Sequence, residues 1–231
     1  MNITSMKETL QFLSELNKNN NREWFAENKT RYQNIRAKIE NVTAELVSRL
    51  VEIEPDVAGM QPQECLYRIY RDTRFSPDKT PYKRHIGIYI NPHGGKKSQL
   101  GGYYLHIEPG KCIVGGGLWC PPMEILKAVR RSIYENVDEY LEIIRDPEFR
   151  KYYQEVGEDL LKTAPKGFPK DWEHIDLLKP RSFTVLGKIT DRAVTSSNMA
   201  EKVMEYFRAM KPYNDFVNYV FEEDPGLPRF F

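Results

Sequence analysis

Apolar residues at the start of the chain recur with the spacing of amphipathic helices. The first group predicts a helix that ends in the asparagine-rich run at 17–21, because asparagine tolerates the left-handed conformation in which many helices end. A second group repeats every seven positions from Phe25 to Ile53 and predicts one long helix that begins near Asn20. The first group consists of Met6, Leu10, Leu13 and Leu16.

The spacing of the apolar residues changes in the middle third of the chain. Four short segments rich in tyrosine, isoleucine and valine lie at 65–70, 84–90, 102–108 and 111–118, with turn residues between them. Pro109 and Gly110 separate the last two segments and predict a tight hairpin turn. We therefore expect three or four antiparallel strands.

Helical patterns return after residue 120. Pro121 and Pro122 open a predicted helix whose apolar face continues to Ile144, and a shorter helix is expected at 146–157. A strand at 182–186 and two closing helices follow, the second opened by Pro212.

This order indicates an α+β fold: an antiparallel sheet of about four strands in the middle of the chain, packed by N-terminal and C-terminal helices. Because no linker-like stretch interrupts the sequence, we expect residues 1–231 to form a single domain.

The composition is that of a folded protein without a strong overall charge. Hydrophobic residues make up 40% of the 231 residues and charged residues 29%, so the chain can bury a core. The formal net charge of +1 gives no field that would draw the protein to nucleic acid. Any binding of an anion must therefore come from a local cluster of basic residues.

The cysteines and the apolar runs indicate in which cellular compartment the protein is expected. Cys65, Cys112 and Cys120 are odd in number and show no paired spacing, so we expect a reducing cytoplasm rather than a disulfide framework. Residues 1–5 lack the basic and apolar regions of a signal peptide. No run approaches the length of about 18 apolar residues that spans a membrane, so we expect no membrane association.

A local basic cluster occupies residues 68–84, between two of the predicted strands. It contains six basic residues and two acidic ones. Alternation in the preceding strand places Arg68 on the same face as Tyr70, and Arg71 and Arg74 follow at the mouth of the loop. Arginine offers paired donors that match carboxylate and phosphate oxygens, so neighbouring guanidiniums favour an anionic ligand.

An alternative is that the loop supplies its own anions. Asp72 and Asp78 would then clamp the loop through internal ion pairs. Two carboxylates against six cations leave an excess of positive charge, which favours a ligand. Pro77 and Pro81 restrict the backbone, so we expect a stiff loop of the kind that a preorganised binding site needs.

The same loop carries a family resemblance. The segment 68–83, RIYRDTRFSPDKTPYK, resembles the signature of the domain of unknown function 2461 family. Further stretches that resemble this family are NNREWF at 20–25, GYYLHI at 102–107, GGGL at 115–118 and PKGF at 165–168. The resemblance covers nearly the whole chain and implies one intact domain, but it implies no particular reaction.

Two weaker signals lie outside the loop. His85, His93, His106 and His174 show no metal-ligand spacing with one another or with the cysteines, so we expect no metal site. His85 and His106 fall on adjacent predicted strands and can be near neighbours, with hydrogen bonding within the sheet as the expected role. The glycine run at 115–117 can expose backbone amides to an anion, although close packing of a strand is the favoured interpretation.

The predicted function is the binding of a small anionic ligand that carries phosphate or carboxylate. Asp72 and His106 are the available proton carriers if a reaction takes place. Because arginines on both sides keep its pKa low, Asp72 is expected to orient its neighbours rather than to move protons. The sequence indicates no particular reaction, cofactor or oligomeric state. The predicted ligand-binding residues are Arg68, Tyr70, Arg71, Asp72, Arg74, Lys79, Lys83 and His106.

Two other hypotheses remain open. In the first, the same loop docks on nucleic acid or on an acidic protein partner, although the net charge of +1 argues against a nucleic-acid surface. In the second, the protein is an interaction module that uses an exposed apolar stripe on the long N-terminal helix.

Overall fold

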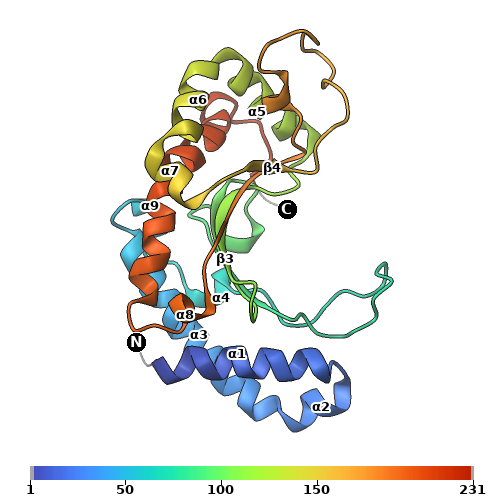
Figure 1. The fold of residues 1–231 in the computed structure, drawn as a ribbon, viewed down its shortest axis with the longest axis vertical. Helices are drawn as coiled ribbons and strands as arrows, with labels where there is room; N and C mark the ends of the chain where they lie inside the picture. The colour runs from blue at the N-terminus through green and yellow to red at the C-terminus, as the bar shows by residue number, and fades with distance from the viewer. Residues whose placement is uncertain (1–2, 230–231) are drawn as a thin grey trace. The chain divides into compact units, whose positions relative to one another are not determined.

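The computed structural model describes residues 3–229 and confirms the α+β class. Within these residues, one antiparallel sheet of five strands is flanked by helices (Figure 1). The strand order across the sheet is β1-β2-β3-β5-β4. The strands are β1 Ile86–Ile90, β2 Gly102–Ile107, β3 Ile113–Leu118, β4 Val156–Glu158 and β5 Ser182–Lys188.

The N-terminal third is helical, but the predicted long helix is divided. Helix α1 spans Ile3–Lys18, and the residues expected to form one further helix form α2, Arg22–Glu27, and α3, Lys29–Leu50. Asn28 lies between them, and its side-chain amide donates to the Trp24 carbonyl at 2.9 Å. Periodicity did not reveal this break because apolar residues on both sides of it remain buried.

The predicted strand at 65–70 is wrong. Its first residue belongs to α4, Pro62–Cys65, which a capping box of Gln61 and Glu64 initiates. The remainder pairs only through isolated bridges, from Leu66 to Ile88 and from Tyr70 to Tyr82. β4, by contrast, was not predicted, because a three-residue strand in an irregular stretch has no readable alternation.

Two further boundaries differ in the C-terminal half. Asn136 separates α5, Met123–Glu135, from α6, Val137–Arg145, and Pro212 lies inside α9 rather than at the start of another helix. The buried residues Met210 and Tyr213 flank Pro212, so the packing of α9 continues across it. The other helices are α7 Pro147–Tyr152, α8 Asp191–Val194 and α10 Val220–Glu223, and the 3₁₀ turns are η1 Pro55–Val57, η2 Gly95–Lys97 and η3 Ile175–Leu178.

The chain divides into two compact units. The first is built around α1 and α3, whose inward residues Leu13 and Ile35 are completely buried. The second is built around α5 and the C-terminal part of α9, with Ile133 and Phe207 equally buried. None of the helices in the described part of the chain has both the length and the apolar character needed to cross a bilayer. The first unit contains the residues up to Lys96 with Tyr104–Val114 and Lys188–Glu205, and the second contains the rest.

The glycine run at 115–117 lies within β3 and serves close packing. A Cβ atom on Gly116 would lie 2.1 Å from the Gly102 carbonyl oxygen and 2.6 Å from the sulfur of Met210. Gly117 has a φ of +84°, and a Cβ there would lie 2.2 Å from the Phe183 carbonyl oxygen. The packing interpretation of this run therefore agrees with the structure, since no side chain fits at these positions.

Gly116→Ala should destabilise the second unit, because the new methyl group collides with a backbone oxygen that cannot move away. Overpacking of this kind costs roughly 1–3 kcal/mol, occasionally more. Urea denaturation followed by circular dichroism measures the loss. Gly110→Ala is the control: Gly110 has a φ of +73°, but an added Cβ meets nothing within 4 Å, so only the strain of a left-handed residue is expected. A smaller loss for Gly116→Ala than for Gly110→Ala would contradict this account.

Candidate functional site

Residues 68–84 form an extended arm in the first unit, with two sides that run antiparallel (Figure 1). The Arg71 N–H donates to the Pro81 carbonyl at 2.9 Å, and the Lys83 N–H donates to the Ile69 carbonyl at 2.7 Å. These two bonds enclose the isolated bridge between Tyr70 and Tyr82. We call residues 68–84 the arm, and the part around Ile69 and Lys83 its base.

A side-chain amide anchors the base of the arm. Asn20 donates from Nδ2 to the Tyr82 carbonyl at 3.0 Å, and its Oδ1 accepts from the Tyr82 N–H at 3.1 Å. The neighbouring Asn21, rather than Asn20, caps α2. The Phe25 ring stacks on the Tyr82 ring with centroids 3.9 Å apart. Asn20 thus satisfies both backbone groups of Tyr82 as a partner strand would.

Arg71 organises the outer part of the arm. Its Nη1 donates to Asp78 Oδ2 at 2.7 Å and to the Thr80 carbonyl at 3.2 Å, and it also contacts the Thr80 hydroxyl. Its Nη2 donates to the Ser76 hydroxyl at 3.2 Å. With four acceptors around it, this guanidinium holds the turn of the arm in place and has little capacity left for a ligand.

Arg74 is paired within the arm as well. Its Nε and Nη2 donate to the two carboxylate oxygens of Asp72 at 3.0 and 2.7 Å, a bidentate pair that remains exposed to solvent. The side-chain hydrogen bonds from Arg74, followed by its backbone N–H, lower the pKa of Asp72 to about 2. The internal pairing that the sequence left as an alternative therefore exists for both Arg71 and Arg74.

Arg68 and Lys83 differ from these two arginines. Within residues 3–229 neither forms an ion pair. Both line a small recess at the base of the arm, with a volume of about 10 Å³, which is roughly the space of one water molecule. Burial, followed by the charge of Arg68, lowers the pKa of Lys83.

The other residues of the recess add positive charge and aromatic surface. Arg36 and His85 line it, and the Lys83 ammonium lies 5.1 Å from the centroid of the Tyr67 ring. Arg36 is balanced by Glu40 at 3.2 Å, but no carboxylate lines the recess itself among the described residues. The base of the arm is therefore a small positively charged surface, although Asp72 outside the recess still acts electrostatically on Arg68.

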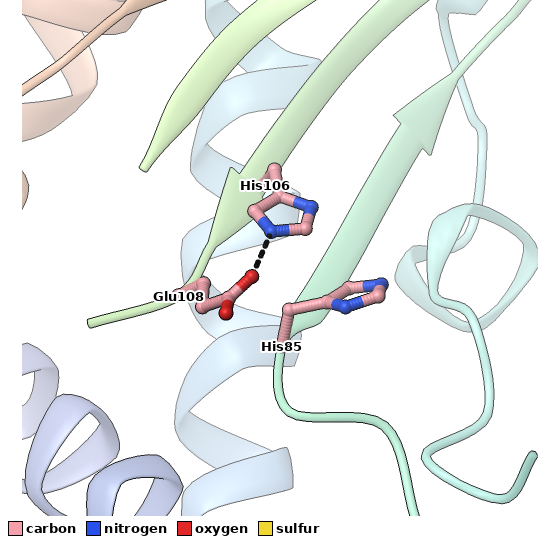
Figure 2. Close-up of side chains that lie close together, drawn as sticks. All are labelled: His85, His106 and Glu108. Atoms are coloured by element: carbon pink, nitrogen blue, oxygen red, sulfur yellow. Dashed lines mark hydrogen bonds and ion pairs between the residues drawn. The ribbon is translucent and has the colours of Figure 1, made fainter. Parts of the chain in front are cut away.

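A histidine cluster adjoins the recess through His85. His85 directly precedes β1, His106 lies in β2, and their rings stack with centroids 4.2 Å apart, which confirms that they are near neighbours. His106 Nε2 lies 3.0 Å from Glu108 Oε2 (Figure 2). His106 Nδ1 lies 2.9 Å from the Tyr104 hydroxyl. We call His85, His106 and Glu108 the histidine cluster.

Burial dominates the protonation of this region. It lowers the pKa of His85 to about 4, with smaller contributions from His106 and Lys83, so the His85 imidazole is neutral at neutral pH. Burial also raises the pKa of Tyr104, which keeps its hydroxyl protonated beside His106. The side chains of His106 and Glu108 are 15% and 22% exposed, so solvent and small solutes still reach the cluster.

A larger cavity, of about 780 Å³, lies in the second unit. Its lining includes Phe149 and Phe216, and no arginine or lysine of the described part of the chain contributes to it. An anion would be repelled here, and none of the predicted site residues lines this cavity. Its acidic residues are Glu139, Glu142, Asp146, Asp215 and Glu223.

The structure therefore divides the predicted site residues into groups. Arg71, Asp72 and Arg74 pair within the outer arm, and the Lys79 ammonium there donates to the Thr73 carbonyl at 3.0 Å. Arg68 and Lys83 line the recess, and His106 belongs to the adjoining histidine cluster. Tyr70 is half exposed and lies against Phe25 and Tyr82.

Sequence reasoning did not include Asn20, Arg36, His85, Tyr104 or Glu108 among the site residues. For Tyr104 and Glu108 a signal was present, because they alternate with His106 along one strand and so share its face. For Arg36 no signal existed, since its place beside the recess depends on how α3 packs.

Comparison with known proteins supports the family resemblance. A family model described as "Conserved hypothetical protein (DUF2461)" matches residues 8–216. The chain belongs to the DUF2461 family. The match covers the arm, the recess and the histidine cluster, and it extends over residues of both units. No curated protein and no solved structure matches the chain.

Asn20→Ala should loosen the base of the arm, because two partly buried backbone groups of Tyr82 lose their partner. Leaving such groups unsatisfied costs about 1–3 kcal/mol in unfolding free energy. Urea denaturation measures this loss, and hydrogen exchange at the Tyr82 amide should become faster. Asn19→Ala is the control, since the Asn19 side chain only donates to the exposed Glu15 carbonyl at 2.9 Å. Unchanged exchange at Tyr82 in Asn20→Ala would contradict the anchoring role.

Protonation of Asp78 should loosen the outer arm in acid. The N–H and hydroxyl groups of Thr80, followed by Arg71, lower the pKa of Asp78 from 3.8 to about 2. A lowered pKa means that the pairing is complete above the unfolded value and is lost as the pH falls through about 2. The Thr80 amide resonance should therefore titrate with a midpoint near 2, and Arg71→Gln should raise that midpoint. A wild-type midpoint of 3.8 would show that the pairing does not form in solution.

Proposed function

We propose that the protein binds a compact oxyanion, such as a phosphate or carboxylate group, at the recess at the base of the arm. The observation that carries this proposal is that Arg68 and Lys83 line the recess without a carboxylate partner, whereas Arg71 and Arg74 have theirs. The binding site is therefore narrower than the sequence indicated and lies at the base of the arm rather than along its length.

The chemistry of the two donors suits an oxyanion. The Arg68 guanidinium presents paired N–H donors, and the Lys83 ammonium adds a compact positive charge that is half-buried. The neutral His85 imidazole next to them can donate one further hydrogen bond from a ring nitrogen. A charged hydrogen bond of this kind contributes about 1.5–3 kcal/mol in a partly buried setting.

The size of the recess restricts the ligand. A volume of about 10 Å³, roughly that of one water molecule, is too small to enclose a nucleotide, a sugar or a whole phosphate group, so an oxyanion would place a single oxygen in the recess. The rest of a larger ligand would extend into solvent along the arm. We infer that recognition rests on one phosphate or carboxylate group rather than on the whole molecule.

One observation favours a second candidate, in which the arm docks on an acidic macromolecule. Phe75 near the tip of the arm is 93% exposed, and the Arg74 guanidinium lies 5.8 Å from the centroid of its ring. An exposed aromatic ring beside an arginine is typical of interface residues. The two candidates use different ends of the arm, which makes them separable by mutation.

Phosphate and sulfate should stabilise the protein at constant ionic strength, and Arg68 should carry the effect. At about 100 times the dissociation constant, a ligand raises the unfolding free energy by roughly 2.7 kcal/mol. Thermal unfolding with chloride as the reference salt and a chelator present measures this shift. We expect Arg68→Ala to lower the phosphate affinity at least tenfold, because it removes the paired donors.

Arg74→Ala is the matched control, since it also removes one arginine from the arm but leaves the recess intact. It should respond to phosphate as the wild type does. Equal responses of Arg68→Ala and Arg74→Ala would refute the recess as the binding site. The second candidate would be favoured by binding of an acidic partner with two properties. Phe75→Ala should abolish that binding, and phosphate should not compete with it.

A further inference from the structure

We propose that His85, His106 and Glu108 form a binding site for a divalent transition-metal ion, with Zn²⁺ as the best-suited ion. Each residue offers one ligand atom, and these atoms all lie within 4.8 Å of one another. Neither the family description nor the sequence spacing assigns a metal to this protein. The proposal goes beyond the oxyanion recess and does not depend on it.

The scaffold of the histidine cluster is two neighbouring strands. His106 and Glu108 are separated by one residue at the end of β2, so they lie on the same face, and His85 precedes the adjacent strand β1 (Figure 2). Of the three residues, His106 lies within β2, whereas Glu108 directly follows β2 and His85 directly precedes β1. The ends of two strands therefore hold the backbone next to each residue, and strands hold ligands more precisely than loops. Side-chain movement is left to close the cluster around an ion.

The required movement is small. Metal–nitrogen and metal–oxygen bonds of about 2.0–2.2 Å place tetrahedral ligand atoms roughly 3.3 Å apart. His106 Nε2 and Glu108 Oε2, 3.0 Å apart, are close to this spacing, and their hydrogen bond would be replaced by the two metal bonds. His85 has the larger approach to make, because its ring stacks on that of His106, and its ligand atom lies within 4.8 Å of the other two.

Tyr104 provides the support that a metal-bound histidine needs. Its hydroxyl lies 2.9 Å from His106 Nδ1, the ring nitrogen that points away from Glu108. When Nε2 binds a metal ion, the ring proton resides on Nδ1 and is donated to the Tyr104 oxygen. Such an outer hydrogen bond fixes the tautomer and the orientation of the ring, and its loss typically lowers metal affinity about 10- to 100-fold.

The donor set identifies the class of ion. Two imidazole nitrogens and one carboxylate oxygen match the ligands of zinc sites that keep a position open, whereas Mg²⁺ and Ca²⁺ prefer sets made of oxygen alone. With three protein ligands, the fourth coordination position remains for water or another small ligand. The three residues are only partly buried, so that position remains accessible.

Calorimetric titration with Zn²⁺, in phosphate-free buffer, tests this proposal. Every protein carries Cys120→Ser, because Cys120 is an exposed thiol that can itself bind zinc. We expect one ion per chain, a loss of at least tenfold in affinity for His85→Gln and for Glu108→Gln, and a smaller loss for Tyr104→Phe. His174→Gln is the control, since His174 lies outside the cluster, and it should keep the wild-type affinity.

Absorption of Co²⁺ in the visible range gives an independent reading of the ligand set, and circular dichroism verifies that each variant is folded. The near-isosteric Glu108→Gln change keeps the test decisive even if a histidine variant unfolds. Absence of zinc binding, or wild-type affinity in both His85→Gln and Glu108→Gln, would overturn the proposal.

Arg68→Ala separates this site from the oxyanion recess. Arg68 lines the recess but offers no ligand atom to the metal, so this variant should lose phosphate binding and keep zinc binding. The reverse should hold for Glu108→Gln, which contributes nothing to the recess lining. The assignment of the ligands would be overturned if Arg68→Ala lost zinc binding while the variants of the histidine cluster kept it.

Discussion

The arm carries six cations and only two carboxylates, and the way in which those two negative charges are shared decides the chemistry of the site. Asp78 pairs with Arg71 and Asp72 pairs with Arg74, so both carboxylates are engaged in the outer arm. Among the described residues, no carboxylate lines the recess beside Arg68 and Lys83. Lys83 is half-buried while Arg68 is exposed, and a partly buried cation without a partner is costly, so the proposed anion would gain most beside Lys83.

The fold class could be predicted from the sequence because helices and strands bury residues with different periods. Failures arose where a single residue overrides the period. Asn28 and Asn136 break helices whose apolar faces continue on both sides, and periodicity contains no record of such a break. Pro212 shows the opposite case: burial on both sides of it outweighs the interior cost of a proline, about 3 kcal/mol.

The sequence predicted which charged residues make up the arm but not which of them form ion pairs with one another. The sequence located the basic arm and named the internal ion pairs as an alternative. The number of charges does not reveal which arginines the two carboxylates contact. In the structure Asp78 pairs with Arg71 and Asp72 pairs with Arg74, rather than with Arg68. The lining of the recess also depends on α3, and a contact between distant segments is set by tertiary packing, which local spacing does not encode.

The histidine cluster also could not be predicted from local sequence spacing. Ligand spacing in sequence indicates a metal site when the ligands share one helix or loop, but a site across two strands is defined by strand register. His85 lies 21 positions before His106, yet the order of the sheet places β1 beside β2 and brings the rings together.

His85 is common to the recess and to the cluster, so the two proposed sites are electrostatically linked. Arg68 and Lys83 oppose a dication at the cluster, and an oxyanion in the recess would neutralise that opposition. By thermodynamic linkage, the factor by which the anion tightens metal binding equals the factor by which the metal tightens anion binding. No rearrangement of the backbone is needed for this coupling, although His85 would also have to shift its side chain between the recess and the metal.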